Sequence, residues 1–480
     1  MDLSAIERRL SEFDQTHLLR WAEELSPGQL AALASQLERT DFARWRAEFE
    51  KAKTPAAKID PADVAPIEVF ELPQTDAARA EAAADARKGQ AALQDGRCGV
   101  LLVAGGQGSR LGFEHPKGMF PIGPVRGSSL FQIFAEKILA RGRAAGVRIP
   151  WYVMTSPGNR AETTEYFEKE RYFGLKPEDV FFFNQGESPS VDAATGRMLL
   201  AEKGKLAVNP NGHGGTLLAL QEEGALADMA RRGVDLLYYF QVDNPFVEVL
   251  EPAFLGRHLR TESEFSAKVV RKMLPDEKVG LVVLHRGKPM VIEYSDLPKE
   301  LGEARAAAHG AAAAGGAATA GGLKYWPGSI AIHVFSRGFL ERTATALPCH
   351  VAKKAVPFID GAGALQKPAS ANAIKFEMFI FDALPLARRA CIVETDREEE
   401  FQPLKNATGD DSPATVQAAL MKRAAKWIRS AGIPLETDAQ GAPRVKVEIS
   451  PLAGLDESDF AGRGWPTEPI LVPAYFGGEA

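Results

Sequence analysis

The most constraining feature of the sequence is a short apolar run, VLLVA at 100–104, that ends directly in two glycines. A continuous apolar run of this length is typical of a strand buried on both faces, as in a parallel sheet. Glycines directly after such a strand let backbone N–H groups approach a phosphate or a base closely. The run therefore predicts one strand of an α/β sheet, followed by a ligand-binding loop at its carboxyl end.

Strands and helices alternate along the chain after this run. Further strands are expected at 151–154, 180–183 and 236–242, and helices at 130–140, 161–171 and 217–230. Residues 265–294 are rich in expected strands. This alternation is typical of an α/β sheet that binds ligands at the carboxyl ends of its strands.

Two further parts flank this α/β region. Residues 1–95 predict a helical N-terminal region, because apolar residues recur there at helical spacing and residues 75–94 are rich in Ala, Glu and Arg. Residues 304–322 are nearly all Ala and Gly and predict a surface loop. We expect a central domain at 96–385 and a small C-terminal domain at 386–480.

Composition excludes several classes of protein. The net charge of −6 argues against a nucleic-acid binder, and no apolar run approaches the roughly 18 residues of a membrane span. The three cysteines form no CxxC pair, which argues against a disulfide framework or a structural zinc site. The N-terminus lacks the apolar stretch of a signal peptide. We therefore expect a cytoplasmic protein with no nucleic-acid or membrane partner.

The glycine-rich loop matches neither of two better-known phosphate loops. In a dinucleotide fingerprint, GxGxxG, the third glycine would fall at Leu111. In a Walker A loop the lysine follows its glycine, whereas Lys117 precedes Gly118. A glycine-rich turn after a strand is common in itself. The two positive charges of Arg110 and Lys117 are what favour a loop that holds a triphosphate.

The loop forms part of a longer string, LxxGGxGTxLGx3PK, which resembles the nucleotide-binding signature of UDP-N-acetylhexosamine pyrophosphorylases, and only Ser109 departs from it. Further matches follow in order at 118–120, 151–156, 183–186, 242–244, 267–270, 292–295, 350–354, 375–377 and 397–406. Ordered matches over roughly residues 95–450 are far more specific than one motif. The chain therefore resembles these enzymes, within the wider UDP-sugar pyrophosphorylase family.

The resemblance implies a Rossmann-like mixed sheet flanked by helices, of the nucleotide-diphospho-sugar transferase type, with the catalytic domain at 96–385. It implies a uridylyltransferase that joins UTP to a sugar-1-phosphate and releases pyrophosphate, with Mg²⁺ as cofactor. UTP and the sugar-1-phosphate are the expected partners of a monomer or weak homodimer. Such an in-line displacement needs no covalent nucleophile, so the protein mainly positions two anions and supplies positive charge.

Asp243 ends an apolar strand, where a carboxylate can hold Mg²⁺ against phosphate oxygens or, alternatively, cap a helix. The resemblance implies the metal role for Asp243. It implies catalytic roles for Arg110, Lys117 and Lys405. The nucleotide-binding residues that it implies are Ala104, Gly105, Gly106, Gln107, Gly108, Lys117, Gln185, Gly212, His213 and Lys375. The substrate-binding residues that it implies are Asn244, Glu293, Tyr294, Ser329, Phe379, Phe381 and Lys405. The acidic run at 398–400 is expected to be a solvated face.

Three further positions, all expected near the ligand or the sugar, depart from the family pattern. His213 replaces an asparagine of the GNGG motif, and Ser329 and Ile332 replace both asparagines of NIxNHFF. The first of these two is the one expected near an N-acetyl group. The sugar is therefore N-acetylglucosamine-1-phosphate or, alternatively, glucose-1-phosphate or another hexose-1-phosphate. A third hypothesis is a non-catalytic regulator that binds nucleotide-sugar, but the retained charged residues argue against it.

Overall fold

The computed structural model describes residues 3–54, 59–306 and 322–478. The predicted Ala- and Gly-rich loop lies almost wholly outside these residues. The chain divides into two compact units. The small unit comprises Met1–Lys58, Gln185–Leu218 and Ala346–Asp382, and the large unit comprises Ile59–Asn184, Ala219–Thr345 and Ala383–Ala480. The predicted domain division at residues 95 and 385 stays a prediction.

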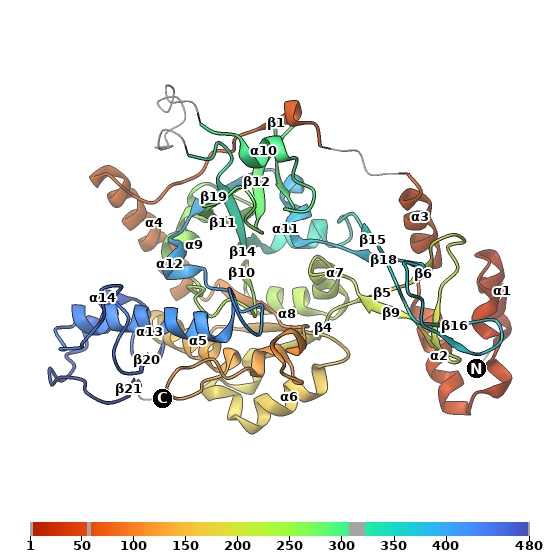
Figure 1. The fold of residues 1–480 in the computed structure, drawn as a ribbon, viewed down its shortest axis with the longest axis horizontal. Coiled ribbons are helices and arrows are strands. Elements are labelled where there is room, and N and C mark those ends of the chain that lie inside the picture. The colour runs from red at the N-terminus through yellow and green to blue at the C-terminus, as the bar shows by residue number, and fades with distance from the viewer. Residues whose placement is uncertain (1–2, 55–58, 307–321, 479–480) are drawn as a thin grey trace. The chain divides into compact units, whose positions relative to one another are not determined.

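The large unit is built on a mixed sheet that has ten strands in the described part of the chain (Figure 1). Four strands run parallel in the order β10 (Leu236–Gln241), β2 (Cys98–Val103), β3 (Trp151–Thr155) and β4 (Val180–Asn184). The antiparallel strand β14 (Pro327–Ser336) joins β10 to β11 (Phe265–Arg271) and β12 (Gly280–His285). The remaining strands are β1 (Val64–Ala65), β13 (Lys288–Ile292) and β19 (Ala390–Glu394). The predicted mixed α/β fold is confirmed.

Helices flank this sheet in the large unit. They are α4 (Asp76–Gln94), α5 (Leu130–Ala145), α6 (Arg160–Lys169), α8 (Ala225–Arg232), α9 (Pro252–Arg260), α10 (Lys299–Glu303), α11 (Arg337–Thr343), α12 (Arg397–Glu400), α13 (Pro413–Ser430) and α14 (Glu457–Ala461). A short pair, β20 (Val447–Ile449) and β21 (Ala474–Phe476), accompanies α13 and α14. Helix α5 is capped at its N-terminus by Ser129, whose hydroxyl accepts the Gln132 N–H. At its C-terminus it is capped by Gly146, which has the left-handed conformation.

The single helix predicted at 217–230 is wrong. The chain forms α7 (Gly215–Glu222) and then α8, with Gly224 between them at φ +80°. A left-handed residue ends a helix, and glycine adopts that conformation at little cost. The apolar periodicity runs on through the break, so spacing alone does not reveal it.

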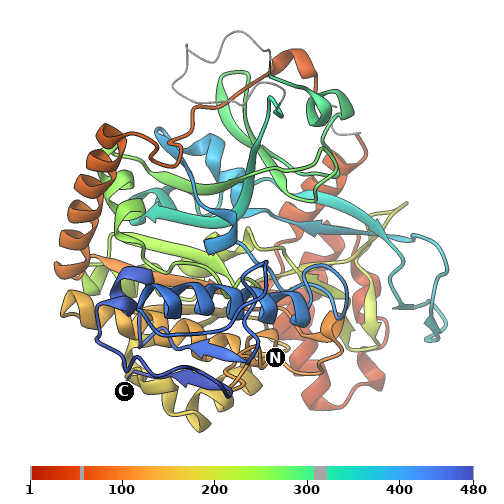
Figure 2. The same cartoon turned by 60° about the vertical axis from the view of Figure 1, so that its left-hand side comes forward.

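Helix α4, the orange-red helix at the left of Figure 2, packs against α9, and each helix has a glycine at the contact. A Cβ at Gly89 of α4 would lie 1.9 Å from the Pro252 carbonyl oxygen, and a Cβ at Gly256 of α9 would lie 1.7 Å from the Asp85 carbonyl oxygen. Only residues without a side chain permit such a backbone contact. The predicted helix at 75–94 is therefore fixed to the large unit by direct helix packing.

The small unit contains the helices α1 (Leu3–Glu12), α2 (Pro27–Arg39) and α3 (Phe42–Ala52), as the helical spacing of the N-terminal segment predicts. Its strands are β5 (Glu187–Pro189), β6 (Val191–Asp192), β7 (Leu200–Glu202), β8 (Lys205–Leu206), β9 (Val208–Pro210), β15 (His350–Lys354), β16 (Phe358–Ile359), β17 (Leu365–Gln366) and β18 (Ala373–Glu377). Leu10, Leu33 and Phe49 pack with Phe376 of β18 in one buried cluster. This apolar face explains why three short helices associate with segments far away in the sequence.

Candidate active site

The glycine-rich loop leaves β2 from a fixed starting point in the large unit. The Ala104 N–H donates to the Met154 carbonyl at 2.8 Å, and the Asn159 amide donates to the Ala104 carbonyl at 3.0 Å. Both backbone groups of Ala104 are thus held by neighbouring segments. The glycines that follow begin from a rigid position, as a preorganised phosphate loop requires.

The loop then folds back on itself. The Lys117 N–H donates to the Gly106 carbonyl at 3.2 Å, and the Gly108 N–H donates to the His115 carbonyl at 2.9 Å. A Cβ at Gly108 would lie 2.7 Å from the Phe113 ring, whereas a Cβ at Gly106 would meet nothing within 4 Å. Gly108 is therefore needed for packing, and Gly106 borders open space that a ligand can enter.

The predicted charged residues of the large unit gather around Lys117. Burial lowers the pKa of Lys117, and the nearby cations Lys405 and Arg110 lower it further, while the carboxylate of Asp243 opposes them. Lys117, Lys405 and Arg110 thus bring three positive charges close to the carboxylate of Asp243. This arrangement can hold a triphosphate and stabilise charge that develops on a leaving pyrophosphate.

One member of this cluster, Asp411, was missed by the sequence reasoning. Burial raises the pKa of Asp411, which lies beside Lys405 and Asp243. Its backbone has φ +56°, and its carbonyl accepts the N–H groups of Lys405 at 2.7 Å and of Asn406 at 3.1 Å. The only available signal was the helix-start motif that follows at Ser412 and Pro413, which marks a turn but not its neighbours.

Asp243 and Lys405 lie on segments that are bonded directly to each other. The Leu404 N–H donates to the Asp243 carbonyl at 2.7 Å. The next residue, Asn244, was predicted to contact substrate, and that role stays a prediction. Its amide donates to the Glu400 carbonyl at 2.7 Å, and its side-chain oxygen accepts the Gln402 N–H at 3.2 Å. These contacts tie Asn244 to the segment at Glu400 and Gln402, so it stabilises the fold there.

The prediction that the acidic run at 398–400 is a solvated face is wrong for Glu400. The Glu400 side chain is only 3% exposed and is paired with Lys268, which is 1% exposed. Neither the acidic composition of the run nor its spacing distinguishes Glu400 from its two neighbours. Its partner lies 132 residues away in the sequence.

The large unit also holds part of the predicted sugar site. Glu293 and Ser329 both approach Gly280 of β12: Ser329 is its partner in β14, and a Cβ at Gly280 would lie 3.3 Å from the Glu293 carboxylate. Tyr294 is 49% exposed. Ile332 is instead 1% exposed and belongs to the hydrophobic core. The loss of the second asparagine therefore acts on packing, and the predicted sugar contact of Ser329 stays a prediction.

The predicted uracil-binding residues lie in the small unit. The Gln185 amide donates to the Gly212 carbonyl at 2.8 Å, which leaves the side-chain oxygen of Gln185 to accept a hydrogen bond. Gly212 has φ +81°, and a Cβ there would lie 2.4 Å from the Met378 carbonyl oxygen. Only glycine fits this position, so the turn is locked against the segment at Met378.

Aromatic rings surround His213 in the same unit. The rings of His213 and Phe379 are stacked with centroids 5.5 Å apart, and Phe381 lies 5.6 Å from His213. The Ile380 N–H donates to Nδ1 of His213 at 3.2 Å, which places the proton of a neutral ring on Nε2. The asparagine replacement is thus built into an aromatic cluster. Lys375, which precedes Phe379 by four residues in the sequence, is half-buried on β18.

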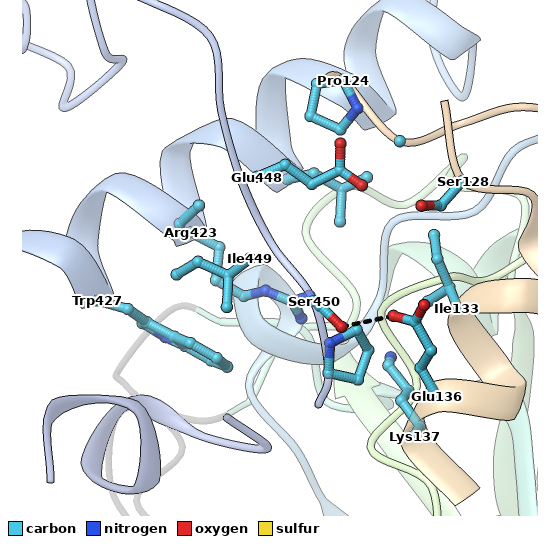
Figure 3. A pocket seen from close by; sticks show the side chains of 14 residues that line it. Pro124, Ser128, Ile133, Glu136, Lys137, Arg423, Trp427, Glu448, Ile449 and Ser450 are labelled. Atoms are coloured by element: carbon cyan, nitrogen blue, oxygen red, sulfur yellow. Dashed lines mark hydrogen bonds between the residues drawn. The ribbon is translucent and has the colours of Figure 1, made fainter. Parts of the chain in front are cut away.

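A small cavity of the large unit lies between α5, α13 and the strand β20 (Figure 3). Its walls include Lys137, Arg423 and Trp427, and Ser450 donates to Glu136 there at 2.6 Å. None of the residues predicted to bind substrate lines this cavity. We therefore do not assign the reaction to it.

Among the described residues, no group of three or more His, Cys, Asp or Glu side chains could hold a metal ion by itself. Asp243 and Asp411 together provide two carboxylates. In addition, none of the described helices has the length and apolar character needed to cross a membrane.

An α/β sheet with a glycine-rich loop and a cationic cluster beyond its parallel strands defines a nucleotide-binding protein. Comparisons with known proteins narrow this class. Residues 40–316 match the family model of UTP–glucose-1-phosphate uridylyltransferase. The chain is 36% identical over 492 residues to the human UDP-N-acetylhexosamine pyrophosphorylase-like protein 1, which covers 96% of this chain and 93% of the relative. It is 37% identical to the UDP-N-acetylglucosamine pyrophosphorylase of Saccharomyces cerevisiae, with 80% of each chain covered.

Solved structures agree with these relatives. The uridine diphosphate N-acetylglucosamine pyrophosphorylase from Trypanosoma brucei superposes with a TM-score of 0.79 and 27% identity, covering 99% of this chain and 98% of that one. The chain belongs to the UTP–glucose-1-phosphate uridylyltransferase family. It is a nucleotidyltransferase that joins UTP to a sugar-1-phosphate and releases pyrophosphate.

Proposed function

We propose that the sugar substrate is N-acetylglucosamine-1-phosphate, that Mg²⁺ is the cofactor, and that the charged residues of the large unit act on the phosphates. The observation that supports the catalytic part is that Arg110, Asp243 and Lys405 all lie near enough to Lys117 to act on its charge. The names of relatives at 36–37% identity support the acetylated sugar.

The residues present fit a magnesium ion. Mg²⁺ is usually bound through one or two carboxylates together with substrate phosphates and water. Asp243 and the neighbouring Asp411 would supply these carboxylates. When bound, the ion would neutralise phosphate oxygens and hold them in a fixed orientation.

The chain's own residues then account for positioning and charge. The backbone N–H groups of Gly105, Gly106 and Gln107 would contact phosphate oxygens of UTP, while the Gly108 N–H holds the loop in shape through the His115 carbonyl. Lys117, held beside this loop by the bond to Gly106, supplies positive charge to the α-phosphate and the departing pyrophosphate. Lys405, fixed next to Asp243 by the Leu404 bond, supplies a second charge for the attacking sugar phosphate.

Within the small unit, Gln185 and Gly212 are the proposed uracil contacts. The side-chain oxygen of Gln185 can accept a hydrogen bond from the uracil N3–H. The turn at Gly212 has no side chain, so a base can lie against its backbone. Phe379 and Phe381 offer apolar faces of the kind that sugars pack against. Lys375 would contact phosphate.

A specific observation favours a second candidate, glucose-1-phosphate. Ser329 stands where the family has the asparagine expected near the N-acetyl group, and it has no amide. A neutral hydrogen bond contributes about 0.5–1.5 kcal/mol, and leaving a buried polar group unpaired costs about 1–3 kcal/mol. The preference for the acetylated sugar should therefore be weak, about ten-fold to a hundred-fold, since 1.4 kcal/mol is a factor of ten.

The test is to measure kcat/KM with both sugar-1-phosphates in the wild type and in Ser329→Asn. We expect the wild type to prefer N-acetylglucosamine-1-phosphate weakly and Ser329→Asn to increase that preference. Higher wild-type kcat/KM for glucose-1-phosphate would make the second candidate correct. A strong wild-type preference for the acetylated sugar, unchanged in Ser329→Asn, would show that another residue supplies the contact.

A further inference from the structure

A buried ion pair is hydrogen-bonded to the segments that carry Asp243 and Lys405. Lys268 of β11 donates to the Glu400 carboxylate at 2.5 Å, and Glu251 is its second partner. Burial alone would lower the pKa of Lys268, but these carboxylates hold it well above its usual value. Lys268 therefore keeps its charge inside the large unit.

The Glu400 side chain connects three separate segments. One oxygen accepts the Lys268 ammonium and the Thr395 hydroxyl, the latter at 2.6 Å, and the other oxygen accepts the Glu248 N–H at 3.0 Å. Glu248 belongs to the loop after β10, which also carries Asp243. One carboxylate thus joins the sheet strand β11, the approach to α12 and the loop after β10.

The backbone of the same residue completes the connection. The Glu400 carbonyl accepts the Asn244 amide at 2.7 Å, and Asn244 in turn accepts the Gln402 N–H at 3.2 Å. The Leu404 N–H then reaches the Asp243 carbonyl at 2.7 Å. In this backbone path Asn244 follows Asp243 directly, and Glu400 lies five residues before Lys405.

We infer that the Lys268–Glu400 pair is a positioning device for the reaction, which sets the distance between Asp243 and Lys405 without touching substrate. A buried pair is weak support for a fold by itself, because an apolar pair of similar volume often serves as well. Here the pair fixes the positions of two loops, one with Asp243 and the other with Lys405, which are proposed to act on the same phosphates. The inference rests on the proposed roles of Asp243 and Lys405.

Glu400→Gln tests this directly, because it keeps the shape and removes the charge. We expect kcat to fall at least ten-fold and half-saturation by Mg²⁺ to require at least five-fold more ion. KM for the sugar-1-phosphate should change less than two-fold. The rise in unfolding temperature on adding Mg²⁺ and UTP together should shrink markedly, and this readout does not depend on turnover.

Asp228→Asn is the matched control. Asp228 is also a buried carboxylate of the large unit, accepting Arg232 at 2.7 Å and the Tyr152 hydroxyl at 3.0 Å. It is expected to lower the unfolding temperature, as Glu400→Gln does, while kcat and the Mg²⁺ requirement stay within two-fold of wild type. Equal effects of the two variants on kcat and on Mg²⁺ would show that Glu400 serves only the fold.

A milder variant covers the case in which Glu400→Gln does not fold. Thr395→Val removes one hydrogen bond to the same carboxylate, and we expect a three-fold or larger increase in the Mg²⁺ requirement. A folded Thr395→Val with a wild-type requirement would overturn the inference. An inactive wild type, with every sugar-1-phosphate, would instead refute the proposed function itself.

Discussion

Lys117→Met should lower kcat without lowering the stability of the fold, because the charge of Lys117 destabilises the folded protein. Burial and the cations Lys405 and Arg110 lower the pKa of Lys117, so its charged form is less favourable in the folded protein than in the unfolded chain. Folding releases a proton from this lysine only at a pH between its lowered folded pKa and the usual value of the unfolded chain, and at lower pH the folded protein keeps the charge at a cost in stability. Its destabilising effect is therefore present at neutral pH and is relieved as the pH rises through the lowered pKa.

The expected magnitude follows from the position of the charge. One preorganised donor aimed at developing charge contributes about 2.7–4 kcal/mol, which is roughly a hundred-fold to a thousand-fold in kcat. Lys117→Met should lose that much, with a smaller change in KM for UTP, while its unfolding temperature at pH 7 equals or exceeds that of wild type. Lys422→Met is a suitable control, because Lys422 is exposed and pairs only loosely with Glu398, at 3.5 Å.

The assays are steady-state pyrophosphate release and thermal unfolding at matched pH. In the wild type, kcat/KM for UTP should also decline as the pH rises, because Lys117 in the enzyme without substrate loses its proton. The decline should begin at a pH below the usual pKa of a lysine. The reasoning is refuted if Lys117→Met retains near-normal kcat. It is equally refuted if the loss of kcat accompanies a large drop in unfolding temperature, because the lysine would then support the fold.

Other variants test the remaining parts of the site. Asp243→Asn should abolish most turnover with the unfolding temperature unchanged, and near-normal turnover at saturating UTP and Mg²⁺ would remove the metal role. Asp411→Asn should raise the Mg²⁺ requirement less than Asp243→Asn does, which a titration of activity against Mg²⁺ measures. Gly212→Ala should raise KM for UTP at least ten-fold, because its Cβ would lie 2.4 Å from the Met378 carbonyl oxygen. An unchanged KM in that variant would place uracil elsewhere.

Much of the fold could be predicted because local patterns decide it. The run at 100–104 is apolar on both faces, so it became a central strand, β2, with a loop at its end. The break at Gly224 could not be predicted, since the residues on either side keep a helical spacing and only the backbone conformation marks the stop. Strand β14 likewise carries an Ala331 with φ +56°, which no propensity indicates.

The candidate site divides in the same way. Lys117 and Asp243 could be proposed because each follows directly on a recognisable motif or strand. Asp411 and Glu400 could not, because their importance comes from partners that only the folded chain brings near. Glu400 even reads as a surface residue within an acidic run, yet it is 3% exposed. Long-range pairing, unlike periodicity, leaves no trace in a single sequence.

The most direct test of the central claim is to incubate the purified protein with Mg²⁺, UTP and each of a panel of sugar-1-phosphates, and to quantify both products. The account predicts UDP-sugar and pyrophosphate in equal amounts, with N-acetylglucosamine-1-phosphate giving the highest kcat/KM and glucose-1-phosphate about ten-fold to a hundred-fold less. Binding of UTP without release of pyrophosphate, whichever sugar-1-phosphate is supplied, would contradict it.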